Sequence, residues 1–414
     1  MAPVKILGRA GCSLAWMIRD FLQRSDVPFE WIELHDDDEA RQLAGVASIA
    51  DESLPICIFD DGTRLERPTI RQLSEKFGWF HDAARTEYDL AIYGAGPAGL
   101  SAAVYGASEG LSTVLIERSA IGGQAGSSSK IENYLGFPDG ISGADLAQRA
   151  RDQACKFGAE ILIARGGVRG EFVPGRGIVY LTDGTKIVSR ANICATGVEY
   201  RRLGLANEDK FLGAGVYYGA GASEAGLCEG KDIYICGGGN SAGQAAMHFS
   251  RCAKSVTIVI RGDSLRSTLS QYLVDRIRSA PNIRVLGHSS VTALSGDETL
   301  ESITITDLQT GKSEVYPTTW FFICIGGRPN TDWAEKVGIV RDQDGYLVTG
   351  PDLPLTGPNP AQWPLSRSPY FLETNMPGVF AAGDVRHGSV KRCASAAGEG
   401  AMAVALVHRY LAGG

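Results

Sequence analysis

The sequence contains no Cys-x-x-Cys pair, although nine of its 414 residues are cysteines. No cysteines stand at the spacing of a zinc site, so we expect no structural metal. Cys194, Cys236 and Cys324 lie within apolar stretches, where inert core thiols are expected. An odd number of cysteines without a framework spacing is typical of a reducing compartment.

The sequence also lacks a basic run and an apolar stretch long enough to cross a bilayer. Its formal net charge of -7 gives no indication of nucleic-acid binding. The longest charge cluster, Asp36 to Glu39, is typical of a solvated helix start. The N-terminus continues directly into a strand-like segment, Val4 to Leu7, rather than a signal peptide. We therefore expect a cytoplasmic protein that binds neither nucleic acid nor membrane.

A glycine-rich turn connects an apolar strand, Tyr88 to Tyr93, with an alanine-rich helix, Leu100 to Glu109. The next strand, Thr113 to Ile116, ends at an acid, Glu117. Glycines at this spacing allow a tight turn, close approach of a pyrophosphate and close packing of helix on strand, while the acid can bond a ribose hydroxyl. The pattern predicts a dinucleotide site with contacts from Gly94, Gly96, Pro97, Ala98, Gly99 and Glu117.

A second glycine-rich turn lies between the strand Asp232 to Cys236 and the helix Ala242 to Ser250. The strand that follows, Ser255 to Ile260, ends in an arginine and lacks an acid. An acid would repel a 2'-phosphate and an arginine can pair with it, so the pattern favours NADPH, with NADH as the alternative. The residues predicted to bind this nucleotide are Gly237, Gly239, Asn240, Ser241, Ala242, Arg261 and Arg266.

Two dinucleotide turns in one chain indicate a flavin enzyme with a nicotinamide domain inserted into its flavin domain. We predict an α/β fold with two Rossmann-like dinucleotide-binding domains, for FAD and NAD(P)H, preceded by a small thioredoxin-fold domain. The predicted boundaries are 1–82 for the small domain, 83–202 and 319–414 for the two flavin halves, and 203–318 for the nicotinamide domain. Pro351 to Pro369 is expected to be a surface loop, with no function assigned.

The small domain has the expected order strand, helix, strand, strand and helix, with a cysteine at a helix N-terminus and Pro55 before the third strand. This order resembles the glutaredoxins and thioredoxins. The positive end of a helix stabilises a thiolate, which makes Cys12 a candidate nucleophile. The second cysteine of those families is missing, because the fourth residue of the motif is Ala15. A degenerate docking domain therefore stays an equal alternative.

From Tyr88 to Leu411 the sequence resembles thioredoxin reductases of the low-molecular-weight type, within the pyridine nucleotide-disulfide oxidoreductases. The resemblance rests on motifs in the family order, which are Gly94 to Gly99, Gly122-Gly123-Gln124, Ile131-Glu132-Asn133-Tyr134, Ala195-Thr196-Gly197, Gly237 to Ala242 and Gly383-Asp384.

The resemblance implies an FAD enzyme that is a homodimer and uses NAD(P)H. It places Asp384 at the ribityl chain, and Gly123, Gln124 and Asn133 along the flavin and its phosphates. It also places the start of the last helix, Lys391-Arg392-Cys393-Ala394, near the isoalloxazine ring, where a helix N-terminus would stabilise the anion of reduced flavin.

The sequence departs from the family at its redox disulfide. Alignment puts Gly219 and Ala222 where the two cysteines belong, and only part of the family's His-Arg-Arg signature remains around Arg261. One hypothesis is electron transfer from NAD(P)H through flavin to a partner protein or small disulfide, with Cys12 as the attacking thiol. A second is transfer without a thiol step, to ferredoxin, flavodoxin or a small oxidant. A third is a flavin-bearing redox sensor.

Overall fold

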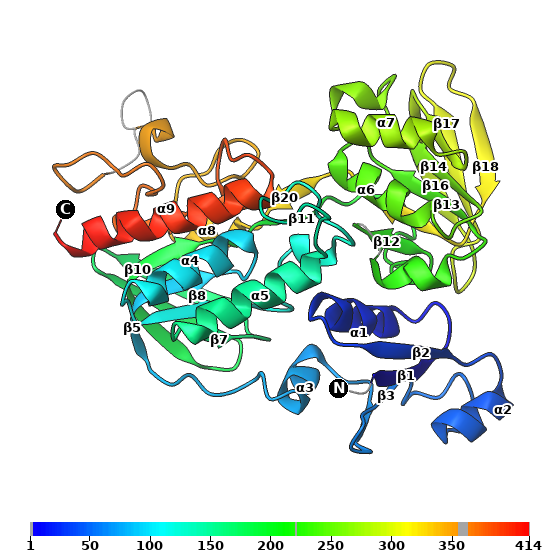
Figure 1. Ribbon diagram of the computed structural model, residues 1–414, viewed down its shortest axis with the longest axis horizontal. Helices are drawn as coiled ribbons and strands as arrows, with labels where there is room; N and C mark the ends of the chain where they lie inside the picture. The colour runs from blue at the N-terminus through cyan, green and yellow to red at the C-terminus, as the bar shows by residue number, and fades with distance from the viewer. Residues whose placement is uncertain (1–2, 220–221, 355–362, 414) are drawn as a thin grey trace. The chain divides into compact units, whose positions relative to one another are not determined.

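The computed structural model describes residues 3–219, 222–354 and 363–413. The chain divides into two compact units (Figure 1). Unit 1 comprises residues 1–69, 127–130 and 200–327, and unit 2 comprises residues 70–126, 131–199 and 328–414. The N-terminal segment therefore belongs to the same compact unit as the predicted nicotinamide domain. The predicted division into four domains stays a prediction.

Unit 2 is built on a mixed seven-stranded sheet with the order β7-β6-β5-β10-β9-β8, in which β21 also pairs with β10. Strands β5, β6, β7, β10 and β21 are parallel. Strands β8 and β9 form a hairpin whose second strand pairs antiparallel with β10, and the sequence analysis did not predict this hairpin. The predicted strands at Tyr88 and Thr113 are confirmed. The strand bounds are β5 Glu87–Tyr93, β6 Thr113–Ile116, β7 Glu160–Leu162, β8 Gly167–Val173, β9 Arg176–Leu181, β10 Lys186–Cys194 and β21 Val379–Ala381.

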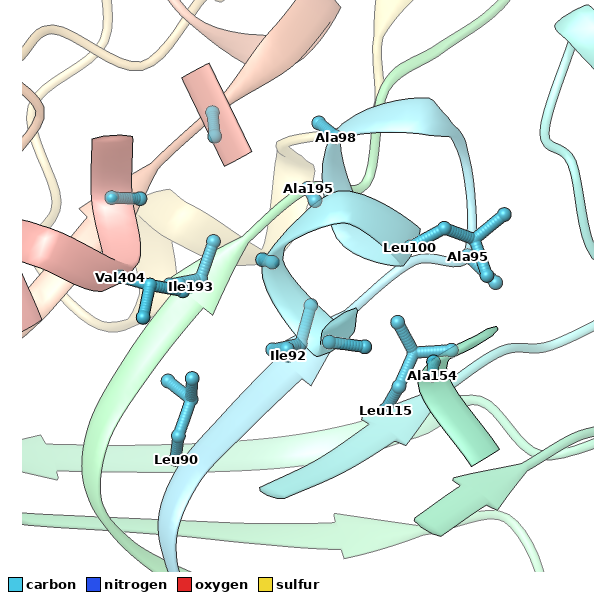
Figure 2. Close-up of a cluster of buried hydrophobic side chains, with 14 of the residues drawn as sticks. Leu90, Ile92, Ala95, Ala98, Leu100, Leu115, Ala154, Ile193, Ala195 and Val404 are labelled. Carbon is cyan, nitrogen blue, oxygen red and sulfur yellow. The ribbon is translucent and has the colours of Figure 1, made fainter. Parts of the chain in front are cut away.

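The core of unit 2 lies between this sheet and the helices α4 and α9. Figure 2 shows side chains of this cluster gathered together from β5, β6, β10, α4 and α9, among them Ile92, Leu115, Ile193, Leu100 and Val404. Burial of branched apolar side chains of this size contributes about 1.5 to 3 kcal/mol each. The helices and short turns of unit 2 are α3 Ile70–Lys76, α4 Pro97–Ser108, η2 Ala125–Ser127, α5 Gly143–Lys156, α8 Asp332–Lys336, η5 Gly350–Asp352, η6 Gly383–Val385 and α9 Cys393–Leu411.

Helices α4 and α9 approach closely because small residues stand at their contact. A Cβ on Gly400 would lie 2.1 Å from the carbonyl oxygen of Ala98, so no side chain fits there. Ser101 Oγ donates a hydrogen bond to the carbonyl oxygen of Ala397 at 2.7 Å. The C-terminal helix is therefore fixed directly on the first turn of α4.

The nicotinamide half of unit 1 contains a parallel five-stranded sheet with the order β12-β19-β13-β14-β15 and a three-stranded antiparallel sheet. Strand β19 pairs with β13 and so belongs to the five-stranded sheet of this half. The strands are β12 Val216–Tyr218, β13 Asp232–Cys236, β14 Ser255–Val259, β15 Ile283–Leu286, β16 Ser289–Ser295, β17 Ser302–Asp307, β18 Ser313–Pro317 and β19 Phe321–Ile323. Its helices and turns are η3 Ala222–Leu227, α6 Asn240–Phe249, η4 Leu265–Ser267 and α7 Gln271–Ser279.

The first 69 residues form a four-stranded sheet with the order β2-β1-β3-β4. Strand β1 is parallel to β2 and antiparallel to β3, and the Leu54–Pro55 peptide bond is cis. The predicted strands and the first helix are confirmed, whereas membership of the thioredoxin fold stays a prediction. The elements are β1 Val4–Gly8, α1 Ser13–Arg24, β2 Phe29–Glu33, α2 Asp37–Glu39, η1 Ala40–Ala44, β3 Ile56–Ile58 and β4 Arg64–Glu66.

Two short strands, β11 Val198–Tyr200 and β20 Gly327–Pro329, pair with each other as a separate sheet. Part of the predicted loop from Pro351 to Pro369 lies outside the described residues. Within the described ranges, no helix combines the length and the hydrophobicity that crossing a membrane requires. The same residues contain no group of three or more side chains suited to hold a metal ion.

We expect Gly400→Ala to destabilise unit 2 by about 1 to 3 kcal/mol, because the added methyl group must push α9 away from the backbone of Ala98. The control is Gly398→Ala on the same helix, where a Cβ meets nothing within 4 Å. Alanine there should stabilise by roughly 1 kcal/mol, from helix propensity alone. Denaturant unfolding followed by circular dichroism measures both. Equal stability of the two variants would contradict the close contact.

Candidate flavin and nicotinamide sites

The strands of unit 2 end together at one edge of the sheet. Cys194 at the end of β10 pairs with Tyr93 at the end of β5 and with Ala381 at the end of β21, and Tyr93 also pairs with Ile116. The segments that follow these four residues therefore leave the sheet side by side. They carry the predicted site residues Gly94, Glu117, Ala195 and Asp384. In open α/β sheets, this carboxyl edge is where ligands bind.

The glycines of the first turn have different roles. A Cβ on Gly94 would lie 2.4 Å from the carbonyl oxygen of Ala195, and one on Gly99 would lie 1.8 Å from that of Gly94. The fold itself requires both. Gly96, the residue that caps α4, has no neighbour closer than 3.9 Å to such a Cβ. Its open side, at the N-terminus of α4, is a place where a phosphate fits, because the backbone N–H groups of the first turn lack helix partners.

The carboxylate of Glu117 is fixed at the rim of this turn. Its two oxygens accept hydrogen bonds from the backbone N–H groups of Ala95, at 2.8 Å, and Ser119, at 2.9 Å. Gly122 donates from its backbone N–H to the carbonyl oxygen of Ala95 at 2.7 Å, which brings the Gly122-Gly123-Gln124 motif to the same turn. A Cβ on Gly123 would lie 3.0 Å from the Cα of Gly96.

Asp384 lies directly after Gly383, whose missing side chain allows contact with α4. A Cβ on Gly383 would be 2.8 Å from that of Ala98. Burial raises the pKa of the Asp384 carboxyl, and nearby Lys391 opposes this shift. Within the described residues, no hydrogen bond reaches the Asp384 side chain. A half-buried carboxylate of this kind suits a hydroxyl donor, and the ribityl chain of FAD carries such hydroxyls, so the residues fit the flavin.

The turn that holds Asp384 is supported by an ion pair that the sequence analysis missed. Glu399 accepts hydrogen bonds from the backbone N–H of Gly383 at 2.7 Å and from the guanidinium of Arg386 at 2.6 Å. A second missed contact joins His387 Nδ1 and Asp342 Oδ2, 2.6 Å apart. The only local signal is that both basic residues lie close after Asp384 in the sequence, because their partners are 13 and 45 residues away from them.

The Lys391-to-Ala394 motif forms the start of α9, as predicted. Arg392 caps the helix and Cys393 is its first residue. Lys391 Nζ donates to the carbonyl oxygen of Asp384 at 2.8 Å, and burial raises the pKa of the Cys393 thiol. Asn133 is exposed just after the bridge between Ile131 and Ile141, and its place at the flavin stays a prediction.

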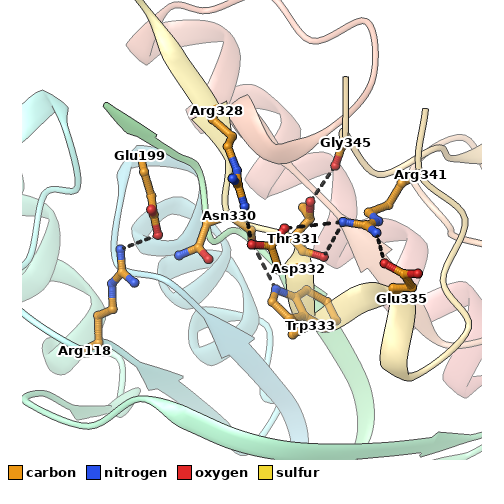
Figure 3. Close-up of polar contacts among 10 residues, drawn as sticks. All are labelled: Arg118, Glu199, Arg328, Asn330, Thr331, Asp332, Trp333, Glu335, Arg341 and Gly345. Carbon is orange, nitrogen blue, oxygen red and sulfur yellow. Dashed lines mark hydrogen bonds and ion pairs between the residues drawn. The ribbon is translucent and has the colours of Figure 1, made fainter. Parts of the chain in front are cut away.

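The Ala195-Thr196-Gly197 motif is held by the segment that follows β20. Thr196 Oγ1 donates to the carbonyl oxygen of Asn330 at 3.0 Å, and the backbone N–H of Asn330 donates to the carbonyl oxygen of Gly197 at 3.1 Å. Gln124 Nε2 donates to the carbonyl oxygen of Val198 at 2.8 Å. Figure 3 shows the polar contacts around this segment, in which Arg118 pairs with Glu199, Arg328 with Asp332, Arg341 with Glu335, Thr331 with Gly345 and Trp333 with Asn330.

The second glycine turn, in unit 1, has the same geometry. A Cβ on Gly237 would lie 2.2 Å from the carbonyl oxygen of Cys324, while one on Gly239, which caps α6, meets nothing within 4 Å. Asn240 uses its amide to bind Ser270, both as donor at 2.9 Å and as acceptor at 2.8 Å. We infer that Asn240 shapes the turn. Ser241 and Ala242 begin the helix, and Ala242 is buried.

Arg261 and Arg266 are exposed near this turn. Neither forms an ion pair with a carboxylate of the described chain, so both guanidinium groups are available to a phosphate. Thr268 Oγ1 donates to the carbonyl oxygen of Gly238 at 2.6 Å, which connects their segment to the turn. The arrangement suits a 2'-phosphate.

The cysteines of unit 1 do not form a replacement dithiol at this turn. Cys236 ends β13 and Cys324 directly follows the neighbouring strand β19, but Cys236 belongs to one hydrophobic cluster and Cys324 to the cluster on the opposite sheet face. Burial raises the pKa of Cys236 to about 11 and that of Cys324 to about 12. Cys12 is half-buried and caps α1, as predicted.

The fold and these two turns define a two-dinucleotide flavoenzyme. Residues 88–400 match the family model of the pyridine nucleotide-disulphide oxidoreductases, and the chain belongs to this family. A thioredoxin reductase of Listeria innocua is 35% identical over 326 residues, which cover 78% of this chain and 94% of that relative. One of Bacillus subtilis is 33% identical over 326 residues, covering 78% of this chain and 95% of the relative.

Solved structures give the same result. The thioredoxin reductase of Lactococcus lactis in the FR conformation has a TM-score of 0.70 at 27% identity, and that of T. acidophilum has 0.69 at 30% identity. Each comparison covers 78% of this chain and 99% of the other. The protein is therefore an FAD- and NADPH-dependent oxidoreductase of the thioredoxin reductase type. This confirms the predicted α/β fold with FAD and NADPH domains, the enzyme class and the cofactors.

We expect Gly96→Ala to leave the apoprotein folded but to weaken FAD binding at least about tenfold, because its methyl group has room in the fold and would meet only a ligand. Gly99→Ala is the contrasting variant, since its methyl group would collide with the backbone of Gly94 and unfold the turn. Bound FAD by absorbance and apoprotein unfolding by circular dichroism separate the two effects. Undiminished FAD content in Gly96→Ala would place the phosphates elsewhere.

We expect NADPH to reduce the flavin faster than NADH by about tenfold at most, and Arg261→Ala to abolish this preference. The control is Arg278→Ala, which removes an exposed arginine at the C-terminal end of α7. Anaerobic stopped-flow reduction measures all three proteins with both nucleotides. A preference that survives in Arg261→Ala would show that this arginine does not bind the 2'-phosphate.

Proposed function

We propose that the protein moves electrons from NADPH through FAD to a disulfide or thiol-linked acceptor without an internal dithiol. The family membership supports the donor and the flavin. The absence of any Cys-x-x-Cys in the sequence supports the missing relay. The flavin contacts in this proposal are the turn from Gly94 to Gly99, Glu117 and Asp384, and the nicotinamide contacts are the turn from Gly237 to Ala242 with Arg261 and Arg266.

The proposal rests on the lack of room for a side chain at Gly219. Its φ is +88°, and a Cβ there would lie 2.3 Å from the phenol oxygen of Tyr200. Tyr200 is itself held by a hydrogen bond with Ser127, 3.2 Å between the two hydroxyl oxygens, and its ring stacks on Tyr218. A cysteine at this position would need a strained backbone and a displaced tyrosine. The side chain of Ala222 lies outside the described residues.

The same observation favours a second candidate, electron transfer without any thiol step, to ferredoxin, flavodoxin or a small oxidant. Because a cysteine does not fit at position 219, electrons leave the flavin either directly to an external acceptor or through another thiol. Cys12 is the candidate for that thiol. The two functions differ in whether activity depends on its sulfur.

We expect thioredoxin reduction with NADPH to be far below roughly 10 per second, an ordinary turnover for an enzyme. Cys12→Ser tests the residual activity, and Cys155→Ser is its control because Cys155 is an exposed thiol on α5. Activity lost only in Cys12→Ser supports the thiol route. Activity equal in both variants and in wild type supports the route without a thiol, and rapid thioredoxin turnover would contradict the proposal.

We also propose a homodimer with a redox protein or a small disulfide as partner, because the resemblance is to dimeric enzymes. Light scattering that gives a solution mass near the single-chain 44.0 kDa would contradict the dimer.

A further inference from the structure

A buried ion pair connects the N-terminal segment to the nicotinamide half within unit 1. Nη2 of Arg19, on α1, lies 3.2 Å from Oε1 of Glu224, on η3. The two side chains are 6% and 0% exposed, respectively. The guanidinium of Arg19 also stacks on the ring of Trp31, 4.7 Å from its centroid. Removing one partner from a buried pair leaves an uncompensated charge, so each residue requires the other.

The preceding turn of α1 makes an apolar contact with the same half. Trp16 lies three residues before Arg19, on the same side of the helix, and its ring is 6.3 Å from that of Tyr217. Tyr217 in turn stacks on Trp320 at 5.4 Å and on Phe322 at 5.2 Å. Trp16 therefore completes an aromatic cluster that belongs to the nicotinamide half.

Two glycines allow the backbones to approach. Gly213 has a φ of +73°, and a Cβ on it would lie 2.9 Å from the Cβ of Trp16 and 3.0 Å from the Cα of Ser13. Gly11 has a φ of +69°, and a Cβ on it would lie 2.5 Å from the methyl group of Thr299. The residues on both sides of Cys12 are therefore in contact with the nicotinamide half.

We propose that α1 is a docking element, which fixes the N-terminal segment on the nicotinamide half and restricts access to Cys12. The N-terminal segment then moves with the nicotinamide half and is not a free carrier. This inference concerns attachment and holds whether or not the acceptor is thiol-linked.

A charge-swap series in the full-length holoenzyme tests the proposal. The variants are Arg19→Glu, Glu224→Arg and the combination of both. The measurement is the rate at which a maleimide labels Cys12, followed by peptide mass spectrometry, with exposed Cys155 of unit 2 as internal reference. Each single variant should label Cys12 at least about tenfold faster, and the swap should return the rate to within about threefold of wild type.

The matched control is Arg9→Glu, because Arg9 and Glu298 also pair across the two parts, at 3.0 Å, but with side chains 44% and 75% exposed. An exposed pair contributes little, so its loss should leave the rate unchanged. A folded Arg19→Glu protein that labels Cys12 at the wild-type rate would overturn the proposal. An equal rise of the labelling rate in Arg9→Glu and in Arg19→Glu would also overturn it. Where Arg19→Glu fails to fold, Glu224→Gln removes the charge at nearly the same volume, and an unchanged rate there would overturn the proposal equally.

Discussion

The contact between Ala98 and the C-terminal part of the chain is the constraint on which unit 2 depends. The carbonyl oxygen of Ala98 leaves no room for a side chain at Gly400, and its methyl group leaves none at Gly383. Segments far apart in sequence thus meet at the first turn of α4, where Gly96 lies. The candidate flavin site proposed at this edge is consequently shaped by close backbone contacts. Glycine and alanine recur there because any larger residue would separate the two helices.

Local signals explain what the sequence could predict. The turns at Gly94 and Gly237 follow from a strand, a glycine cluster and a helix within a short stretch, whereas the start of α9 was predicted from the family resemblance. The pairing of β19 with β13 joins distant residues, so local signals could not predict it. The closure of Gly219 by Tyr200 and the pairing of Arg19 with Glu224 are also long-range contacts. No periodicity or spacing in the sequence predicts these contacts.

The cysteines show how burial separates structural thiols from reactive ones. Burial raises the pKa of Cys57 and that of Cys194 to about 12, so at neutral pH both stay protonated and act as small apolar residues. The prediction that Cys194, Cys236 and Cys324 are core residues is confirmed by their burial. In this disulfide oxidoreductase, several cysteines are therefore buried packing residues rather than reactive thiols.

The attachment of residues 1–69 has a consequence for encounters with other proteins. A tethered segment competes for its surface as though it were free in solution at a millimolar concentration. A separate protein with a similar helix end, present at about 1 μM, must bind roughly a thousandfold more tightly to displace it. The pair of Arg19 and Glu224 thereby helps to keep α1 on its surface in the presence of separate proteins that carry a similar helix.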